Sequence, residues 1–289
     1  MEPLVTIVII NWNGLKDTDQ CLKSLAKVSY TNYKIIVIDN GSENQEAAKI
    51  KSQHPGVILI ANSYTKGFAA ACNQGIEKAI ELAADYVLLL NNDTVAEEHF
   101  LQHLVKYAGN NSNVILSPKI LYAGTSIVQN LGGRLIPLIG GSINIGKGKP
   151  SANYTKPLSP DFLSGCAIFI PSQAIRQVGM LDPIYFAYYE DADWCYRAKS
   201  AGYRLVVLPE SIIWHKHSSS SKNAQEKKFY YIGRNSIIFA RKNLHGLTKA
   251  VWVLAAIAVA GMYMFIFTYN KSMRRARWNG VKQGLAAIL

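Results

Sequence analysis

Apolar and polar positions alternate in blocks along the first 121 residues of the chain. Five short runs rich in Val, Ile and Leu predict buried strands, and polar, helix-permissive stretches separate them. The predicted strands are 5–11, 34–40, 57–62, 86–93 and 114–121, and the predicted helices are 15–29, 43–53, 67–84 and 97–109. Strands that alternate with helices indicate βαβ units and a mostly parallel sheet covered by helices on both faces.

This alternation stops after residue 121. The Gly- and Pro-rich segment 131–150 predicts a mobile excursion or an irregular hairpin. A strand over 161–172, a helix over 190–203 and two extended segments, 204–209 and 211–217, are expected to follow. We therefore expect one α/β domain over residues 1–222, large enough to be a catalytic domain. One half lies at about 1–121 and the other at about 160–222.

The remaining segment, 223–289, has a different charge and is expected to form a helical tail. The chain has 31 Lys and Arg and 19 Asp and Glu, and from Lys222 onward there are twelve bases and one acid, Glu226. The first 221 residues therefore hold 19 bases and 18 acids. Because almost all of the net charge of +12 lies in the tail, we expect a membrane surface as its partner and no nucleic acid.

The tail also contains the most apolar stretch of the chain. Segment 226–246 has helical spacing of aromatic and aliphatic residues, and the uncharged run 250–270 is about long enough to cross a bilayer. Basic residues flank that run on both sides, so a span and a helix lying in the interface both remain open. We expect membrane contact through about 226–289.

The cysteines and the N-terminus predict an intracellular setting. The four cysteines are isolated from one another, which favours reduced thiols. Glu2 and Pro3 stand where a secretion signal carries a basic segment. With the basic tail, this places the protein at the cytoplasmic face of the cell membrane.

Polar side chains follow four of the predicted strands at the point where each strand ends. These are Asn11 and Asn13, Asp39, Asn62, and Asn91 with Asp93. One such residue alone is typical of a turn. Four strand ends together predict a binding site, because ligands of open α/β sheets bind beyond the carboxyl ends of the strands.

The known phosphate-binding motifs are absent from the sequence. No G-x-G-x-x-G follows the first strand and no G-x-x-x-x-G-K-[ST] occurs, which argues against dinucleotide and P-loop sites. Lys66, Gly67 and Asn73 lie near a predicted helix N-terminus, where an anionic ligand is favoured.

Two further clusters are candidates for chemistry. Glu190, Asp191 and Asp193 put three carboxylates within four residues at a helix start. Capping and the helix dipole explain one or two of them, so we expect at least one to face a site as a general base. His215 and His217 share one face of a strand, and a metal site and an ordinary surface pair both remain open.

Taken in order, several segments resemble the inverting family 2 glycosyltransferases of the GT-A fold. They are VTIVIINWN, IIVIDNGS, KGFAAACNQGI, LLLNND, FLSGCAIFIP, MLDPIYFAYYEDADWCYRAKSAGYRL and WHKHSSSS. More narrowly, they are similar to the rhamnosyltransferase-like members that build cell-surface polysaccharides. The resemblance runs from residue 4 to about 245 and implies a Rossmann-like α/β sheet with a basic and apolar helical appendage.

The resemblance implies a nucleotide-diphosphate sugar donor, dTDP-rhamnose or a UDP-sugar, and a divalent metal, Mn²⁺ or Mg²⁺. Its donor-side positions are held here by Asn11, Asn13, Asp39, Lys66, Gly67, Asn73, Asn91, Asp93 and Arg234. Asp39 would meet the base, Asn91 the ribose and Arg234 the diphosphate, although a membrane-facing cation explains Arg234 equally well. Asp93 and His215 would hold the metal.

The resemblance also assigns the reaction. Asp191, beside Glu190, would deprotonate an acceptor hydroxyl while the metal neutralises the leaving diphosphate, which gives inversion. The acceptor would be a lipid-linked or growing glycan. Asn91 departs from the family, where many members carry Asp, so Asp93 alone supplies the anionic metal contact and metal affinity is expected to be weaker.

Two alternative functions remain open from the sequence. One is a polyprenyl-phosphate glycosyltransferase of the dolichyl-phosphate mannose synthase type, whose acceptor needs no hydroxyl-activating base. The other is a non-catalytic nucleotide-sugar-binding or scaffold protein.

Overall fold

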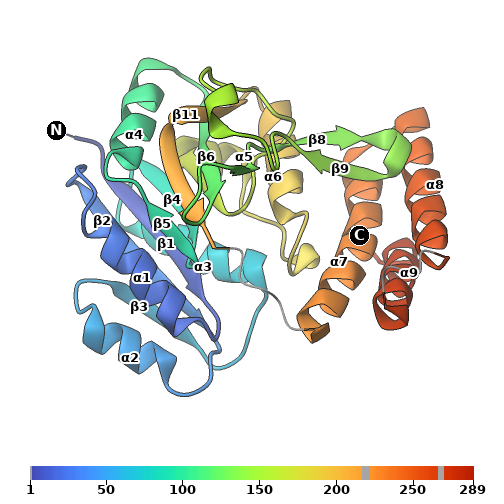
Figure 1. The fold of residues 1–289 in the computed structure, drawn as a ribbon, viewed down its shortest axis with the longest axis horizontal. Coiled ribbons are helices and arrows are strands. Elements are labelled where there is room, and N and C mark those ends of the chain that lie inside the picture. Colours follow the sequence, from blue (N-terminus) through green and yellow to red (C-terminus); the bar gives the residue numbers. More distant parts are fainter. Residues whose placement is uncertain (1, 217–221, 266–269) are drawn as a thin grey trace.

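The elements of the protein surround one large sheet (Figure 1). The computed structural model describes residues 2–216, 222–265 and 270–289, so His217 lies outside the described residues. In chain order the elements are β1 (Val5–Asn11), α1 (Leu15–Leu25), β2 (Tyr33–Asn40), α2 (Glu46–Gln53), β3 (Ile58–Asn62), α3 (Phe68–Glu81), β4 (Tyr86–Asn91), β5 (Thr94–Ala96), α4 (Phe100–Asn110), β6 (Val114–Tyr122), β7 (Val128–Asn130), β8 (Gly133–Ile136), η1 (Pro137–Ile139), β9 (Gly141–Asn144), η2 (Ser151–Asn153), β10 (Ala167–Pro171), α5 (Ser172–Val178), η3 (Pro183–Tyr185), α6 (Glu190–Ser200), β11 (Arg204–His215), α7 (Lys222–Asn243), α8 (Gly246–Tyr263) and α9 (Lys271–Ala286), where η marks a 3-10 helix.

The main sheet has the strand order β3-β2-β1-β4-β10-β6-β11-β5, with β7 beside β6. The first four strands in this order are parallel, as the sequence predicts. β10 is antiparallel to both of its neighbours, so the sheet as a whole is mixed. Between β6 and β10 no helix crosses the sheet, and the chain therefore re-enters from the edge at which β6 ended.

Helices cover both faces of the sheet and divide its core into two apolar clusters. Strand residues such as Ile7 and Leu88 pack with α1 and α4 on one face. Alternate residues such as Val8 and Leu89 pack with α3 and α6 on the other. Because both faces are buried, the parallel strands read as continuous apolar runs and not as alternating ones.

Several elements differ in extent from the sequence prediction. The predicted strand 86–93 ends at Asn91, and Thr94–Ala96 pairs separately with the end of β11. The two extended segments near 204–217 form one strand with an irregularity between Leu208 and Ile212. Segment 131–150 holds the hairpin β8–β9, and α5 was not predicted.

The three tail helices pack against the α/β domain. On α7, Ile238 and Phe239 are buried in the same cluster as α3 and α6. On α8, the Trp252 side chain is buried and its Nε1–H donates to the carbonyl of Ser236 at 3.1 Å. Among the described residues, α8 is the one helix whose length and composition suffice to cross a membrane, and 17% of its apolar window is buried.

This packing predicts unequal effects of two substitutions on α8. Trp252→Ala should lower the free energy of unfolding by about 3–5 kcal/mol, because it leaves a cavity between α8 and α7. Leu254→Ala is the matched control, since Leu254 is 67% exposed, and it should change stability by less than about 0.5 kcal/mol. Chemical denaturation in detergent-free buffer measures both, and equal stabilities would show that α8 is not docked.

Candidate active site

Asp39 and Asn11 lie side by side at the carboxyl ends of β2 and β1. The Asn11 side chain is buried, and its Nδ2 donates to Asp39 Oδ2 at 2.9 Å. The same Nδ2 lies 3.0 Å from Ser42 Oγ and 2.9 Å from Glu46 Oε2. Asn11 is therefore occupied by protein groups and orients the Asp39 carboxylate.

Ser42 and Glu46 complete this corner, although the sequence reading did not select them. Ser42 N–H donates to Asp39 Oδ1 at 3.0 Å. Glu46 Oε2 accepts the N–H groups of Gly14 and Leu15 at 3.0 and 3.1 Å, which satisfies the start of α1. Only the closeness of Ser42 to Asp39 in sequence gave a signal for either residue.

Asn13, Asn73 and the loop of Lys66 and Gly67 are held by hydrogen bonds to residues distant in sequence. Asn13 Oδ1 accepts Glu43 N–H at 2.8 Å. The loop of Lys66 and Gly67 is tied to β2, because Lys66 N–H donates to Asn40 Oδ1 at 3.0 Å. The Asn73 amide bonds both ways with the Leu181 backbone, at 2.8 and 3.1 Å. Asn73 thus fixes α3 to the segment before α6.

The residues after β4 separate into different roles. Asn91 N–H donates to the Cys166 carbonyl at 2.9 Å, which joins the end of β4 to the start of β10. Asn92 turns inward and donates to Thr18 Oγ1 at 2.9 Å. Asp93 is nearly buried and faces His215 at the end of β11.

Asp93 and His215 form a close pair. His215 Nε2 lies 2.9 Å from Asp93 Oδ1, and His215 Nδ1 bonds to the side chain of Gln129 on β7. Burial alone lowers the pKa of His215, but Cys166 and the hydrogen bond to Asp93 outweigh it and raise the pKa to about 10. Gln129 fixes the ring so that Nε2 points at Asp93. Gln129 was not predicted from the sequence, because a strand as short as β7 has no recognisable pattern.

Asp191 lies at the start of α6. Its Oδ2 accepts Gly165 N–H at 2.8 Å and its Oδ1 accepts Ala192 N–H at 2.8 Å. Burial raises the pKa of Asp191, while these backbone N–H groups oppose the rise. They stabilise the ionised form.

Glu190 has a different environment. It is buried, and its Oε2 has no hydrogen-bond partner among the described residues. Burial, and then the charge of Asp191, raise the pKa of Glu190 well above its usual value. Burial therefore raises the pKa of both carboxyl groups, and only at Asp191 do backbone N–H groups of other residues oppose the rise.

Asp193 serves the fold. It is fully buried, and it accepts the Arg197 guanidinium at 2.9 Å, Tyr185 Oη–H at 2.9 Å and Asn243 Nδ2–H at 2.7 Å. These bonds connect α6 to η3 and α7. The predicted cluster of three carboxylates is thus divided between the site and the core.

Arg234 lies against the segment that precedes α6. Its Nη1 donates to the Ile184 carbonyl at 2.7 Å and to Asn235 Oδ1 at 2.8 Å. Both bonds are internal to the protein.

The donor set fits a divalent ion that is bound together with a ligand. Asp93 and His215 supply one carboxylate and one imidazole at adjacent positions. Residues 2–216, 222–265 and 270–289 contain no group of three or more His, Cys, Asp or Glu that would hold a metal by itself. An ion at this pair needs further oxygen ligands, which phosphate groups provide.

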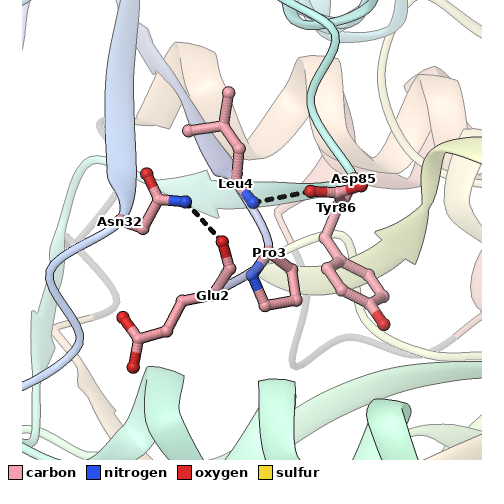
Figure 2. A pocket seen from close by; sticks show the side chains of 6 residues that line it. All are labelled: Glu2, Pro3, Leu4, Asn32, Asp85 and Tyr86. Atoms are coloured by element: carbon pink, nitrogen blue, oxygen red, sulfur yellow. Dashed lines mark hydrogen bonds between the residues drawn. The ribbon is translucent and has the colours of Figure 1, made fainter.

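A cavity of about 680 Å³ lies at the opposite edge of the sheet (Figure 2). It is lined by Glu2, Pro3, Leu4, Asn32, Asp85 and Tyr86, near the starts of β1 and β4. Leu4 N–H donates to Asp85 Oδ2 at 2.7 Å there. None of the predicted site residues lines this cavity, so the candidate site is the carboxyl edge of the sheet.

Comparison with known proteins finds several glycosyltransferases of similar sequence. The chain is 23% identical to the N-acetylglucosaminyl-diphospho-decaprenol L-rhamnosyltransferase of Mycobacterium tuberculosis, with 98% of each chain covered. It is 22% identical to the dTDP-rhamnosyl transferase RfbF of Shigella flexneri, covering 84% of this chain and 82% of RfbF. A pre-mycofactocin glycosyltransferase of M. tuberculosis is 24% identical over 94% of this chain, which spans 58% of that protein.

Solved structures share the fold. The Pyrobaculum calidifontis mannosyltransferase PcManGT, in complex with GDP-Man and Mn²⁺, superposes with a TM-score of 0.62 at 12% identity, over 99% of this chain and 88% of that one. GalNAc-T7 with UDP, GalNAc and Mn²⁺ gives 0.65 at 17% identity, over 83% and 48%. The predicted GT-A fold is confirmed. A family model described as Glycosyl transferase family 2 matches residues 6–175. The chain belongs to glycosyl transferase family 2.

Proposed function

We propose that this enzyme moves a sugar, with inversion, from a nucleotide-diphosphate sugar to a hydroxyl of a lipid-linked or growing glycan. One observation carries the proposal. Gly165 N–H binds Asp191, and the adjacent Cys166 carbonyl binds the backbone of Asn91. Because Gly165 and Cys166 are adjacent, the Asp191 carboxylate is held close to the end of β4, which leads to Asp93.

The names of two relatives support an L-rhamnosyl donor, dTDP-rhamnose, over a UDP-sugar. Asp39, oriented by Asn11 and Ser42, is proposed to accept hydrogen bonds from the nucleotide base. Asn91 is proposed to meet the ribose. Lys66, Gly67 and Asn73 are proposed to frame the donor side, because Lys66 N–H, Gly67 N–H and the Asn73 amide bond to protein groups.

The proposed chemistry divides the two ends of the site. Asp191 takes the proton of the acceptor hydroxyl as that oxygen attacks the anomeric carbon, and Glu190 stays neutral. Asp93 and His215 hold a divalent cation, Mn²⁺ or Mg²⁺, which when bound neutralises the departing diphosphate. Arg234 is proposed to contact the diphosphate, for which its Nη1 would give up the bond to the Ile184 carbonyl.

Substitutions at the acidic pair distinguish the two carboxylates. Asp191→Asn should lower kcat by about 10²–10⁴-fold, because the base is lost. Glu190→Gln should keep kcat within about threefold, because Gln imitates the neutral carboxyl that the site already contains. The raised pKa of Asp191 should put the acid limb of kcat/KM above the usual aspartate range, with activity rising as pH increases through it. Initial rates of nucleotide release, with acceptor present, measure all three.

Each contrary result has a distinct meaning. Transfer retained by Asp191→Asn would favour the polyprenyl-phosphate acceptor, which needs no base. Turnover that is absent from the wild-type enzyme across a panel of nucleotide sugars would favour the non-catalytic alternative.

The bond between Gln129 and His215 predicts how the metal dependence of activity changes when the His215 ring loses its orientation. Gln129→Leu removes the partner of His215 Nδ1 and should raise the Mn²⁺ concentration for half-maximal activity by about 10–100-fold. Gln20→Leu is a control of the same chemistry, since Gln20 bonds to Lys216 instead. A metal titration in which both variants match the wild type would rule out a metal held by His215.

A second part of the proposal concerns location. The outward side of α8 carries the exposed apolar side chains Leu247, Leu254 and Met262, and Phe265 is exposed just beyond its end. The 3-10 helix η1 packs on α8 and exposes Leu138. Basic residues at 249, 271 and 275 flank this surface. Because α8 also buries Trp252 and Ala256 against the protein, we propose that it lies in the membrane interface, at the cytoplasmic face, and does not cross the bilayer.

Leu254→Glu tests this surface. It should lower partition onto vesicles containing anionic lipid about tenfold or more, because a charge replaces an apolar contact with the bilayer. Gln53→Glu, an exposed change of the same charge on α2, should leave partition unchanged. Vesicle flotation measures it. A change in oligomeric state, without a change in flotation, would show that a second copy of the chain covers α8.

A further inference from the structure

The turn that leads into α6 has an unusual backbone conformation. Phe186, Tyr188 and Tyr189 have φ values of +61°, +67° and +76°, a region that aromatic residues rarely adopt. Phe186, with ψ of −56°, forms a tight turn in which Ala187 N–H donates to the Tyr185 carbonyl at 2.6 Å. Turns of this kind are rare and strained. Such a conformation persists only where the surroundings hold it.

One side chain of α7 contacts this turn at three points. Asn235 is fully buried, and its Nδ2 lies 2.8 Å from the carbonyl of Tyr185, 2.8 Å from that of Ala187 and 2.7 Å from that of Tyr188. Its two N–H hydrogens are thus shared among three acceptors. Arg234 donates to Asn235 Oδ1, which fixes the amide with its NH₂ group toward the turn.

The turn determines the direction of the proposed base. Tyr189 precedes Glu190 and Asp191 directly, and its carbonyl accepts Asp193 N–H at 2.8 Å in the first turn of α6. The turn also borders the donor side, because the Phe186 carbonyl accepts Phe68 N–H at 2.6 Å at the start of α3. A shift of this turn would move Asp191 away from Gly165.

We propose that Asn235 is a positioning residue: its amide holds the turn 185–189 in the conformation that sets Asp191 against Gly165. The inference rests on the proposed role of Asp191 as the base. It adds a role for α7, which lies outside the residues 6–175 that the family model matches. The helix lies beside α6 and η3 (Figure 1), so the contact is made across the packed interface of the tail.

Asn235→Ala is the direct test, in the full chain with donor and acceptor. We expect kcat to fall about 10²-fold, because a misplaced base costs rate more than binding. The donor KM should change by less than about threefold. Asn243→Ala is the matched control: Asn243 is also a buried amide on α7, but it bonds to Asp193 and does not touch the turn. It should lower the melting temperature without the loss in kcat.

A double substitution separates this inference from the proposed function. If Asn235 acts through Asp191, adding Asn235→Ala to Asp191→Asn should lower the residual rate by less than about twofold. Losses that multiply would overturn the positioning role and leave the base assignment intact. Full activity of Asp191→Asn alone would instead overturn the proposed function.

A second variant covers failure of the first to fold. Asn235→Ser leaves one hydroxyl donor at the position of the lost Cγ, and should lower kcat by less than Asn235→Ala does, with donor KM unchanged. The proposal is overturned if either Asn235 variant has the kcat of the wild type, or a kcat no lower than that of Asn243→Ala.

Discussion

The candidate site depends on the antiparallel entry of β10 between β4 and β6. β10 runs from the carboxyl edge of the sheet, so its first residues lie beside the last residues of β4. The chain just before β10 therefore supplies Gly165 N–H to Asp191 and the Cys166 carbonyl to Asn91. A parallel strand here would have put these groups at the opposite edge. The reversal of one strand thus brings the two halves of the chain to a single site.

The sequence predicts the first half of this arrangement well, for a local physical reason. Most residues of β1, β2 and β4 are buried, and continuous apolar runs with polar ends reveal these strands and the edge at which Asp39 and Asp93 lie. The direction of β10 is set by what happens over residues 122–166, where the hairpin β8–β9 replaces a crossover helix. No periodicity within β10 itself reports that direction. Gln129 was missed and Asn235, although it stands beside Arg234, was given no role, because each acts through a contact that is distant in sequence.

The acidic run of α6 shows why residue type alone does not assign roles. Glu190, Asp191 and Asp193 have similar intrinsic pKa values, but their surroundings differ. Asp193 meets a guanidinium and two other donors, Asp191 meets two backbone N–H groups, and Glu190 Oε2 meets none among the described residues. Asp193 therefore stabilises the fold, while Asp191 is the proposed base and Glu190 is proposed to stay neutral. This division follows from packing, which sequence spacing does not contain.

In the tail, α7 connects the proposed membrane surface on α8 to the proposed active site. The basic and apolar composition of residues 223–289 suggested a tether separate from the α/β domain, but α7 inserts Ile238 and Phe239 into the main core and Asn235 into the turn before α6. α7 also packs on α8 and α9. The proposed membrane surface on α8 is therefore connected to the turn before α6 through packed helices. Close packing of this kind transmits displacement because protein interiors leave little free space. A bilayer bound at α8 would then hold the carboxyl edge of the sheet at a fixed distance from its lipids, which a flexible tether would not achieve.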